Sequence, residues 1–206
     1  MILGEMTQRR RSSATRELDE ALELARDRST VGFTALYRLL AGEIAAFCRA
    51  RGVHEVDDLV NEVFLGAFRR IGDFSGSGSD FRAYVYRIAR NKIFDLRAKA
   101  RSSLEQLEDT APDGAAADDG DGADARALER IDRRTVLHLV SELTEEQQEV
   151  ILLRFLGDLT VPEVASVTGR AESAVKALQR RGLATLRRKI SDRGSIDFIP
   201  SRDSCG

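Results

Sequence analysis

The sequence of 206 residues contains no tryptophan, three prolines, two cysteines and two histidines. Because Cys205 sits at the extreme end of the chain and Cys48 lies on an apolar helical stripe, the two cysteines do not suggest a disulfide framework. His54 and His138 are too far apart in the sequence to begin a metal-ligand cluster. No stretch approaches the roughly 18 apolar residues of a membrane span, and no signal peptide opens the chain. These absences predict a soluble cytoplasmic protein with no metal and no cofactor.

The formal net charge of −2 hides an uneven distribution of charged residues. Between residues 82 and 101 the chain is basic against Asp95 alone, with Arg82, Arg87, Arg90, Lys92, Arg97, Lys99 and Arg101. Between residues 102 and 125 it carries only acids: Glu105, Glu108, Asp109, Asp113, Asp118, Asp119, Asp121 and Asp124. Since local fields rather than totals steer association, two basic blocks separated by an acidic one remain compatible with nucleic-acid binding.

Residues 144–190 have the pattern of a helix-turn-helix. Thr144 and Thr160 each precede a Gln or Glu by three residues, which is the signature of a capping box at a helix start. Gly157 is expected as a left-handed cap of the first helix, and Gly169 as the turn between a short helix and a longer one from about Ala171 to Ile190. A small, basic outer face of the long helix matches what a major groove admits. The inner stripe is Val175, Leu178, Gly182, Leu186 and Ile190, and the outer face includes Ser173, Lys176, Ala177, Arg180, Arg181, Ala184 and Arg187.

Two further amphipathic helices are expected over Phe33–Cys48 and Glu55–Ile71. The second has an apolar stripe of Val56, Leu59, Val60, Val63, Phe64, Ala67 and Ile71. Its opposite side carries Asp58, Asn61, Glu62 and Leu65, so a leucine stands within an acidic, polar face. This side is either a protein-docking surface or a polar surface with one stray exposed leucine.

A Gly- and Ser-rich loop over Gly72–Asp80 precedes a third helix over about Phe81–Lys99. The expected buried stripe of this helix is Val85, Ala89, Ile93 and Leu96, and the opposite row is Tyr84, Arg87, Ile88 and Asn91. An outward Tyr, Arg and Asn on neighbouring turns offer a stacking platform, a phosphate partner and an amide for single-stranded DNA. A tyrosine packed on the preceding helix beside solvated charges would give the same pattern.

The sequence therefore predicts an all-α protein of two small helical domains. The expected parts are an N-terminal extension over residues 1–28 with a loose first dozen, a helical bundle over 29–101, an acidic flexible linker over 102–125, a helix-turn-helix domain over 126–190 and an irregular tail over 191–206.

Three strings of this sequence resemble the extracytoplasmic-function group of bacterial sigma factors, in the sigma-70 family. Residues 57–65 (DDLVNEVFL) are similar to the family's core-polymerase-binding helix, and residues 81–91 (FRAYVYRIARN) to its promoter-melting and −10-reading helix. Residues 143–188 are similar to its −35-reading domain.

The resemblance implies a non-catalytic promoter-specificity subunit of RNA polymerase that reads the −10 and −35 elements and melts the −10 region. Asp58, Asn61, Glu62 and Leu65 would dock on the clamp of the polymerase's largest subunit, and the C-terminal domain on the flap of the second largest. The loop over 72–80 would form the wall of a pocket for a flipped −10 base, with Asn91 against that base and Tyr84 near the upstream fork; Arg87 and Ile88 share their face. The −35 contacts would come from Ser173, Lys176, Ala177, Arg180 and Arg181. The acidic linker would thread the channel that nascent RNA later occupies, and a dedicated anti-sigma factor would cover the polymerase-binding surfaces.

This chain departs from the family pattern at two places. Tyr84 stands where the family usually has Trp, and Ala177-Leu178 follow Val175-Lys176 where the family often has Ser-Arg. A tyrosine still stacks on bases, with less area.

Two other interpretations are open from the residues alone. A dimeric helix-turn-helix regulator would bind a palindromic operator without polymerase. An enzyme built on the carboxylates Asp58 and Glu62 would need a nucleophile, a phosphate loop or a metal set, which the sequence does not offer. For a sigma factor, we expect the free protein to bind promoter DNA poorly, because the acidic linker competes with DNA for the basic faces.

Overall fold

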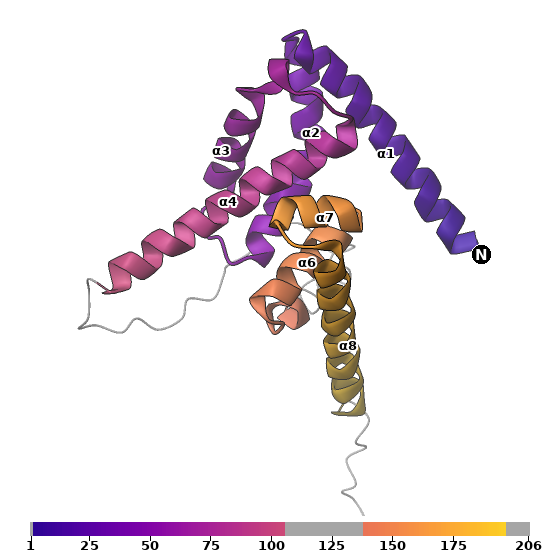
Figure 1. Cartoon of the computed structure of the whole chain (residues 1–206), viewed down its shortest axis with the longest axis vertical. Helices are drawn as coiled ribbons and strands as arrows, with labels where there is room; N and C mark the ends of the chain where they lie inside the picture. Colours follow the sequence, from indigo (N-terminus) through magenta and orange to yellow (C-terminus); the bar gives the residue numbers. More distant parts are fainter. Residues whose placement is uncertain (1, 106–137, 197–206) are drawn as a thin grey trace, which may run out of the picture.

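The computed structural model describes residues 2–105 and 138–196, and its side chains are described over 13–102 and 138–191. Every regular element in these ranges is a helix, and the helices form two units that pack on each other (Figure 1). The all-α class is therefore confirmed. Most of the expected linker, and the first part of the domain expected from residue 126, lie outside the described residues.

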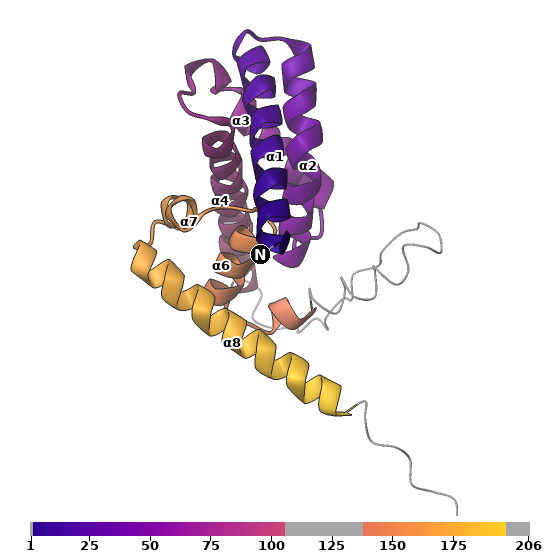
Figure 2. The same cartoon turned by 90° about the vertical axis from the view of Figure 1, so that its right-hand side faces the viewer.

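The N-terminal unit is a bundle of four helices: α1 (Ile2–Arg26), α2 (Thr30–Ala50), α3 (Val56–Phe68) and α4 (Gly78–Glu105), with a short 3₁₀ turn at Ile71–Asp73. Figure 2 shows α1 and α2 running side by side, with α3 and α4 completing the bundle. The helix α2 is long and apolar enough to cross a membrane by length and composition alone. Its Leu36, Leu40 and Ile44 are fully buried against neighbouring helices, so it is the core helix of this unit.

The predicted stripe of α3 is buried throughout, as are Val85, Ala89 and Ile93 of α4. Three expectations for this unit were wrong. Leu96 is 45% exposed, and Phe81 and Tyr86 are the fully buried aromatic side chains of α4 among the described residues. The helix α4 begins at Gly78 inside the expected loop, because Ser77 and Asp80 cap it reciprocally. The helix α1 begins at Ile2, where a loose segment was expected.

The C-terminal unit contains α6 (Glu145–Phe155), α7 (Val161–Thr168) and α8 (Glu172–Ile196). Thr160 and Glu163 form the predicted capping box, with the Glu163 carboxylate 2.5 Å from the Thr160 N–H. Gly169 has φ of 70°, a left-handed conformation that ends α7 and makes the predicted turn into α8. Leu139, Val140 and Leu143, in the described part of the preceding segment, are buried.

Three details of this unit differ from the sequence expectation. Thr144 caps α6 through the Gln147 N–H, but the reciprocal half of the box is not formed. Gly157 is not left-handed; Asp158 takes the positive φ of 50° that reverses the chain. The helix α8 continues past Ile190 to Ile196, and Ile190, expected in the core, is 56% exposed.

Arginines of the N-terminal unit join the two units by pairing with the first turns of α6. Arg51, whose side chain is 2% exposed, binds the Glu145 carboxylate at 3.0 Å and the Gln148 amide oxygen at 3.2 Å. Arg90 binds Glu149, whose side chain is 4% exposed, at 2.8 Å. Since a buried charge is tolerated only when it is paired, these contacts select one docked arrangement of the units.

Candidate polymerase and nucleic-acid interfaces

The outer face of α3 carries the residues predicted to bind a protein partner. Asp58, Asn61, Glu62 and Leu65 are all exposed, and Leu65 is 59% exposed. Asn61 accepts a hydrogen bond from the Tyr37 hydroxyl at 3.3 Å, which fixes the amide on this face. The structure therefore brings the four residues onto one surface around an accessible leucine.

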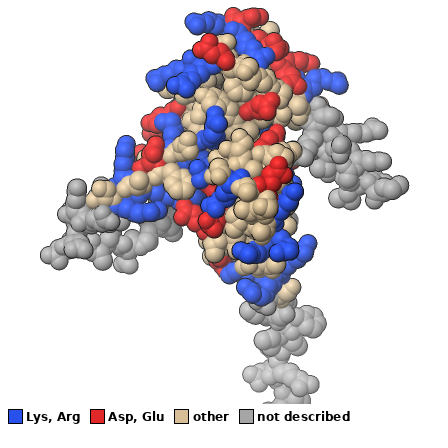
Figure 3. All heavy atoms as spheres, viewed as in Figure 1, with Lys and Arg blue, Asp and Glu red and all other residues tan. Residues whose placement is uncertain are grey.

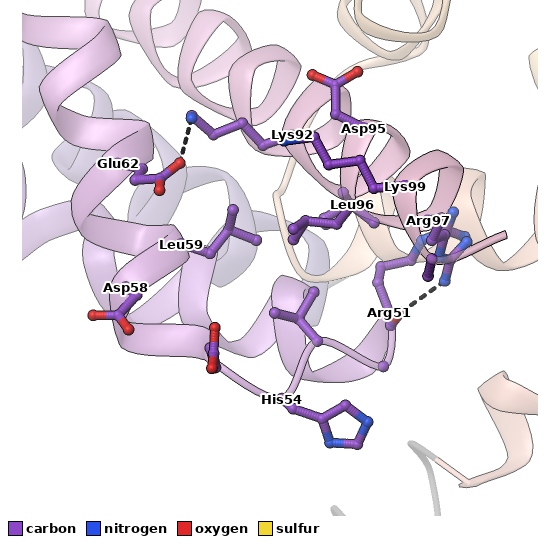
Figure 4. A pocket seen from close by; sticks show the side chains of 15 residues that line it. Arg51, His54, Asp58, Leu59, Glu62, Lys92, Asp95, Leu96, Arg97 and Lys99 are labelled. Atoms are coloured by element: carbon purple, nitrogen blue, oxygen red, sulfur yellow. Dashed lines mark hydrogen bonds and ion pairs between the residues drawn. The ribbon is translucent and has the colours of Figure 1, made fainter. Parts of the chain in front are cut away.

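A hollow of about 580 Å³ lies beside this face, between α3 and α4. Figure 4 shows Glu62 of α3 and Lys92 of α4 pointing toward each other across it, with 2.6 Å between carboxylate and ammonium. The hydrogen bond from Lys92 lowers the pKa of Glu62 below its ordinary value. Asp58 also lines the hollow, so the acidic half of the face borders a basic stretch of α4.

The predicted row on α4 alternates between half-buried and exposed residues. Tyr84 and Ile88 are half-buried, whereas Arg87 and Asn91 are exposed. The Arg87 guanidinium stands 5.4 Å from the centre of the Tyr84 ring, a cation–π distance. The row thus presents an aromatic ring, a cation and an amide in that order along the helix, as the sequence predicted.

An aromatic residue of the preceding loop was not among the predicted site residues. The Phe74 ring lies 5.5 Å from Tyr84 and 5.4 Å from Phe81, centre to centre. A phenylalanine inside the otherwise small, polar string of residues 72–80 was the signal available in the sequence. Together Phe74 and Tyr84 widen the aromatic surface that a single tyrosine would offer.

The first helix of the helix-turn-helix, α7, faces this same row. A second hollow, of about 380 Å³, is lined on one side by Phe74, Tyr84 and Arg87 and on the other by Pro162, Glu163 and Ser166, among others. This contact could not be predicted from the sequence, because a helical pattern does not encode which distant helix will cover an exposed row.

The outer face of α8 is exposed at Ser173, Lys176, Arg180 and Arg181, and half-buried at Ala177. Its inner face is held by Val175 and Leu178, which are buried, while Lys176 on the outer face pairs with Glu172, 3.7 Å away and one turn earlier. Figure 3 shows basic side chains gathering toward the C-terminal half of this helix. A rigid helix with a basic outer face, set behind a Gly turn, has the geometry of a major-groove reader.

Comparison with known families accounts for both units. The model of sigma-70 region 2 matches residues 33–103, and that of sigma-70 region 4 matches residues 133–186. The chain belongs to the sigma-70 family, in its extracytoplasmic-function (ECF) group. Members of this family are transcription initiation factors of RNA polymerase.

Individual relatives agree with that assignment. The chain is 35% identical over 176 residues to the ECF RNA polymerase sigma factor BldN of Streptomyces coelicolor, which covers 84% of this chain and 66% of BldN. It is 31% identical over 151 residues to the ECF sigma factor ShbA of Streptomyces griseus, covering 68% of this chain and 78% of ShbA. The solved structure of CnrH in complex with the cytosolic domain of CnrY has the same fold, with a TM-score of 0.59 and 24% sequence identity. The match covers 87% of the present chain and 98% of the CnrH chain.

Proposed function

We propose that this ECF sigma factor docks on core RNA polymerase through the outer face of α3, captures unpaired −10 DNA on α4 and the loop before it, and reads the −35 element with α8. The observation that carries the proposal is the separation of three chemically distinct exposed faces on three helices. One is acidic around Leu65, one is aromatic and cationic around Tyr84, and one is basic around Arg180.

The docking role rests on an exposed leucine ringed by polar groups. An apolar side chain that is 59% exposed on a well-packed helix contributes nothing to this unit's own core. Asp58 and Glu62 beside it give the surface a negative charge that a basic partner would complement. The clamp of the largest polymerase subunit is the proposed partner, with the flap of the second largest subunit engaging the C-terminal unit.

The melting role rests on stacking. Extruding a base from a duplex costs a few kcal/mol, and stacking on an aromatic side chain returns about 1–3 kcal/mol per base. Phe74 and Tyr84 supply the aromatic surface, and Asn91 supplies exposed donors and an acceptor two turns further along α4. No bond is made or broken, so the part played here is recognition rather than catalysis.

The docked arrangement of the units gives a physical reason for weak promoter binding by the free protein. Elements centred about 25 base pairs apart lie about 85 Å apart along DNA, at the usual rise per base pair. In the docked structure α7 contacts both α4 and α8, which places the two reading helices too close together to reach both elements, and α7 faces the Tyr84 row. Binding to polymerase would therefore have to separate the two units. It would also have to remove the acidic segment from the basic faces, where that segment competes with DNA.

Control by an anti-sigma factor is proposed by analogy with CnrH, whose solved structure contains the cytosolic domain of CnrY. The surface such a protein would most usefully cover is the α3 face, because its occlusion alone prevents assembly with polymerase.

The test is transcription in vitro with purified core polymerase on a library of random promoters. We expect enrichment of templates with two elements at fixed spacing, and no specific gel shift without polymerase. Failure of the protein to co-elute with core polymerase, together with no initiation from any template, would overturn the proposal. Specific binding to a palindrome without polymerase would instead support a dimeric regulator.

A further inference from the structure

The N-terminal helix α1 reaches the loop before α4 through Arg26. The Arg26 Nε donates to the Phe74 carbonyl at 3.2 Å, and its Nη2 donates to the Gly76 carbonyl at 2.6 Å. Glu23, one turn earlier on α1, pairs with the same guanidinium and orients it. A single side chain thus binds two backbone carbonyls of the loop, residues 48 and 50 positions away in the sequence.

The far end of the same loop is held by Asp19. Its carboxylate accepts a hydrogen bond from the Gly78 N–H at 2.5 Å. The backbones lie so close here that a Cβ at residue 78 would be 2.6 Å from the Leu18 Cβ and 2.8 Å from the Asp19 nitrogen. Only glycine fits against α1 at this position, so the contact between helix and loop is part of the fold.

These contacts fix a segment that would otherwise be costly to order. Residues 72–79 contain three glycines and three serines, and fixing the backbone of such residues in one conformation loses much conformational entropy. Gly76 has φ of 155°, which is accessible to glycine. With Arg26 on the Phe74 and Gly76 carbonyls and Asp19 on Gly78, the Phe74 ring is placed where it meets Tyr84 and Phe81.

We propose that Arg26 and Asp19 of α1 are positioning residues for promoter reading, which hold residues 74–78 in the shape that receives the unpaired −10 base. The inference rests on the proposed function of the Tyr84 row. It adds α1, which precedes the matched residues 33–103, to the part of the chain that decides base selectivity.

Because α1 already orders the loop, the loop loses less conformational entropy when a base binds in it. This preorganisation favours capture of the base that fits the pre-formed shape. Removal of either anchor leaves the helices and the α3 face in place, because Leu18, Ala21, Leu22 and Ala25 bury α1 in the core independently of the two polar side chains. The predicted defect is therefore in selectivity rather than in assembly.

The experiment compares Arg26→Gln with Arg16→Gln, and Asp19→Ala with Glu20→Ala; Arg16 and Glu20 are exposed on the same helix. Each variant is assembled with core polymerase, and initiation is measured on promoters carrying each of the four bases at each −10 position. We expect Arg26→Gln and Asp19→Ala to reduce discrimination at one position by about fivefold or more, which is the low end of what a wrong base at a read position typically costs in affinity. The control variants should keep the wild-type preference. Asp19→Asn, which retains an oxygen acceptor for the Gly78 N–H, should restore most of it.

Two further measurements separate the possible outcomes. Hydrogen exchange at the Gly78 amide should accelerate in Asp19→Ala and not in Glu20→Ala, while helix content and polymerase affinity stay unchanged. Discrimination equal to that of the controls, with faster exchange at Gly78, would overturn the positioning role. Asn91→Ala and Tyr84→Ala are measured in parallel. If these two variants also keep the wild-type discrimination, the assignment of the Tyr84 row to −10 reading fails. If they lose discrimination while Arg26→Gln and Asp19→Ala keep it, only the role of α1 is refuted.

Discussion

Gly157, after α6, lies against the ring of Tyr86 on α4, so close that a Cβ at residue 157 would be 2.9 Å from the tyrosine Cζ. Tyr86 is fully buried, and burial raises the pKa of its hydroxyl. The absence of a side chain at residue 157 therefore lets the C-terminal unit approach the core of the N-terminal unit. This contact, the Arg51 and Arg90 pairs, and the α7 hollow all belong to one docked state.

Gly157→Ala should weaken that docking, because the added methyl group meets the Tyr86 ring and the Leu153 carbonyl at 2.9 Å each. We expect a larger radius of gyration in small-angle scattering, and stronger binding of single-stranded −10 DNA by the free protein. Gly42→Ala is the matched control, since a Cβ there meets nothing within 4 Å. An unchanged radius of gyration in Gly157→Ala would show that the close approach does not limit docking.

Glu149→Leu should open the docked state by a different route. The Glu149 side chain is 4% exposed and pairs with Arg90, and removing one partner of a buried pair costs about 3–5 kcal/mol. Because Arg90 is itself 19% exposed and regains some water, we expect the lower end of that range, measured as lost stability in urea unfolding. Glu146→Leu is the control, because Glu146 is 57% exposed and pairs with Arg170 inside the C-terminal unit. Equal losses in the two variants would contradict a special role of the α4–α6 pair.

Leu65→Asp should abolish assembly with core polymerase while leaving the fold intact. Leu65 is 59% exposed, so an aspartate there costs little folding free energy but places a charge at the centre of the proposed docking face. Val31→Asp changes an apolar residue of similar exposure, 67%, that lies on α2. We expect co-elution with polymerase to be lost in the first variant and kept in the second. Retained assembly of Leu65→Asp would remove the α3 face from the interface.

The Ser77–Asp80 cap predicts an acid-sensitive start of α4. Hydrogen bonds from the Ser77 hydroxyl and N–H lower the pKa of Asp80 below its ordinary value. A carboxyl with a depressed folded pKa stabilises the fold above its unfolded pKa, about 3.9, and loses that contribution as the pH falls through the folded value. Ser77→Ala should raise the Asp80 pKa toward the ordinary value in an NMR titration and cost about 1 kcal/mol as a lost cap. An Asp80 pKa that is the same in both proteins would show that the cap is not formed in solution.

The free thiol of Cys48 gives no support to a redox function. It is fully buried on α2, and burial raises its pKa to about 11, so the reactive thiolate is scarce at neutral pH. Cys205 lies outside the described residues.

The sequence by itself determined the helices, their buried stripes and the chemistry of each exposed face. Periodicity placed Val60 inside and Leu65 outside on α3, and the Thr160 cap with the Gly169 turn fixed the helix-turn-helix, because these signals act within a few residues of each other. Local signals failed where a distant element decided the outcome. Leu96 is exposed because it lines the open hollow between α3 and α4, and Gly157 serves a close approach rather than a left-handed turn.

Only the tertiary structure decided that Arg26 and Asp19 hold the loop before α4, that Phe74 stacks on Tyr84, and that the two units dock through Arg51 and Arg90. Each of these contacts joins residues far apart in the chain. Their formation depends on the packing of whole helices, and no local pattern of side chains specifies which partner a charged or aromatic residue will meet.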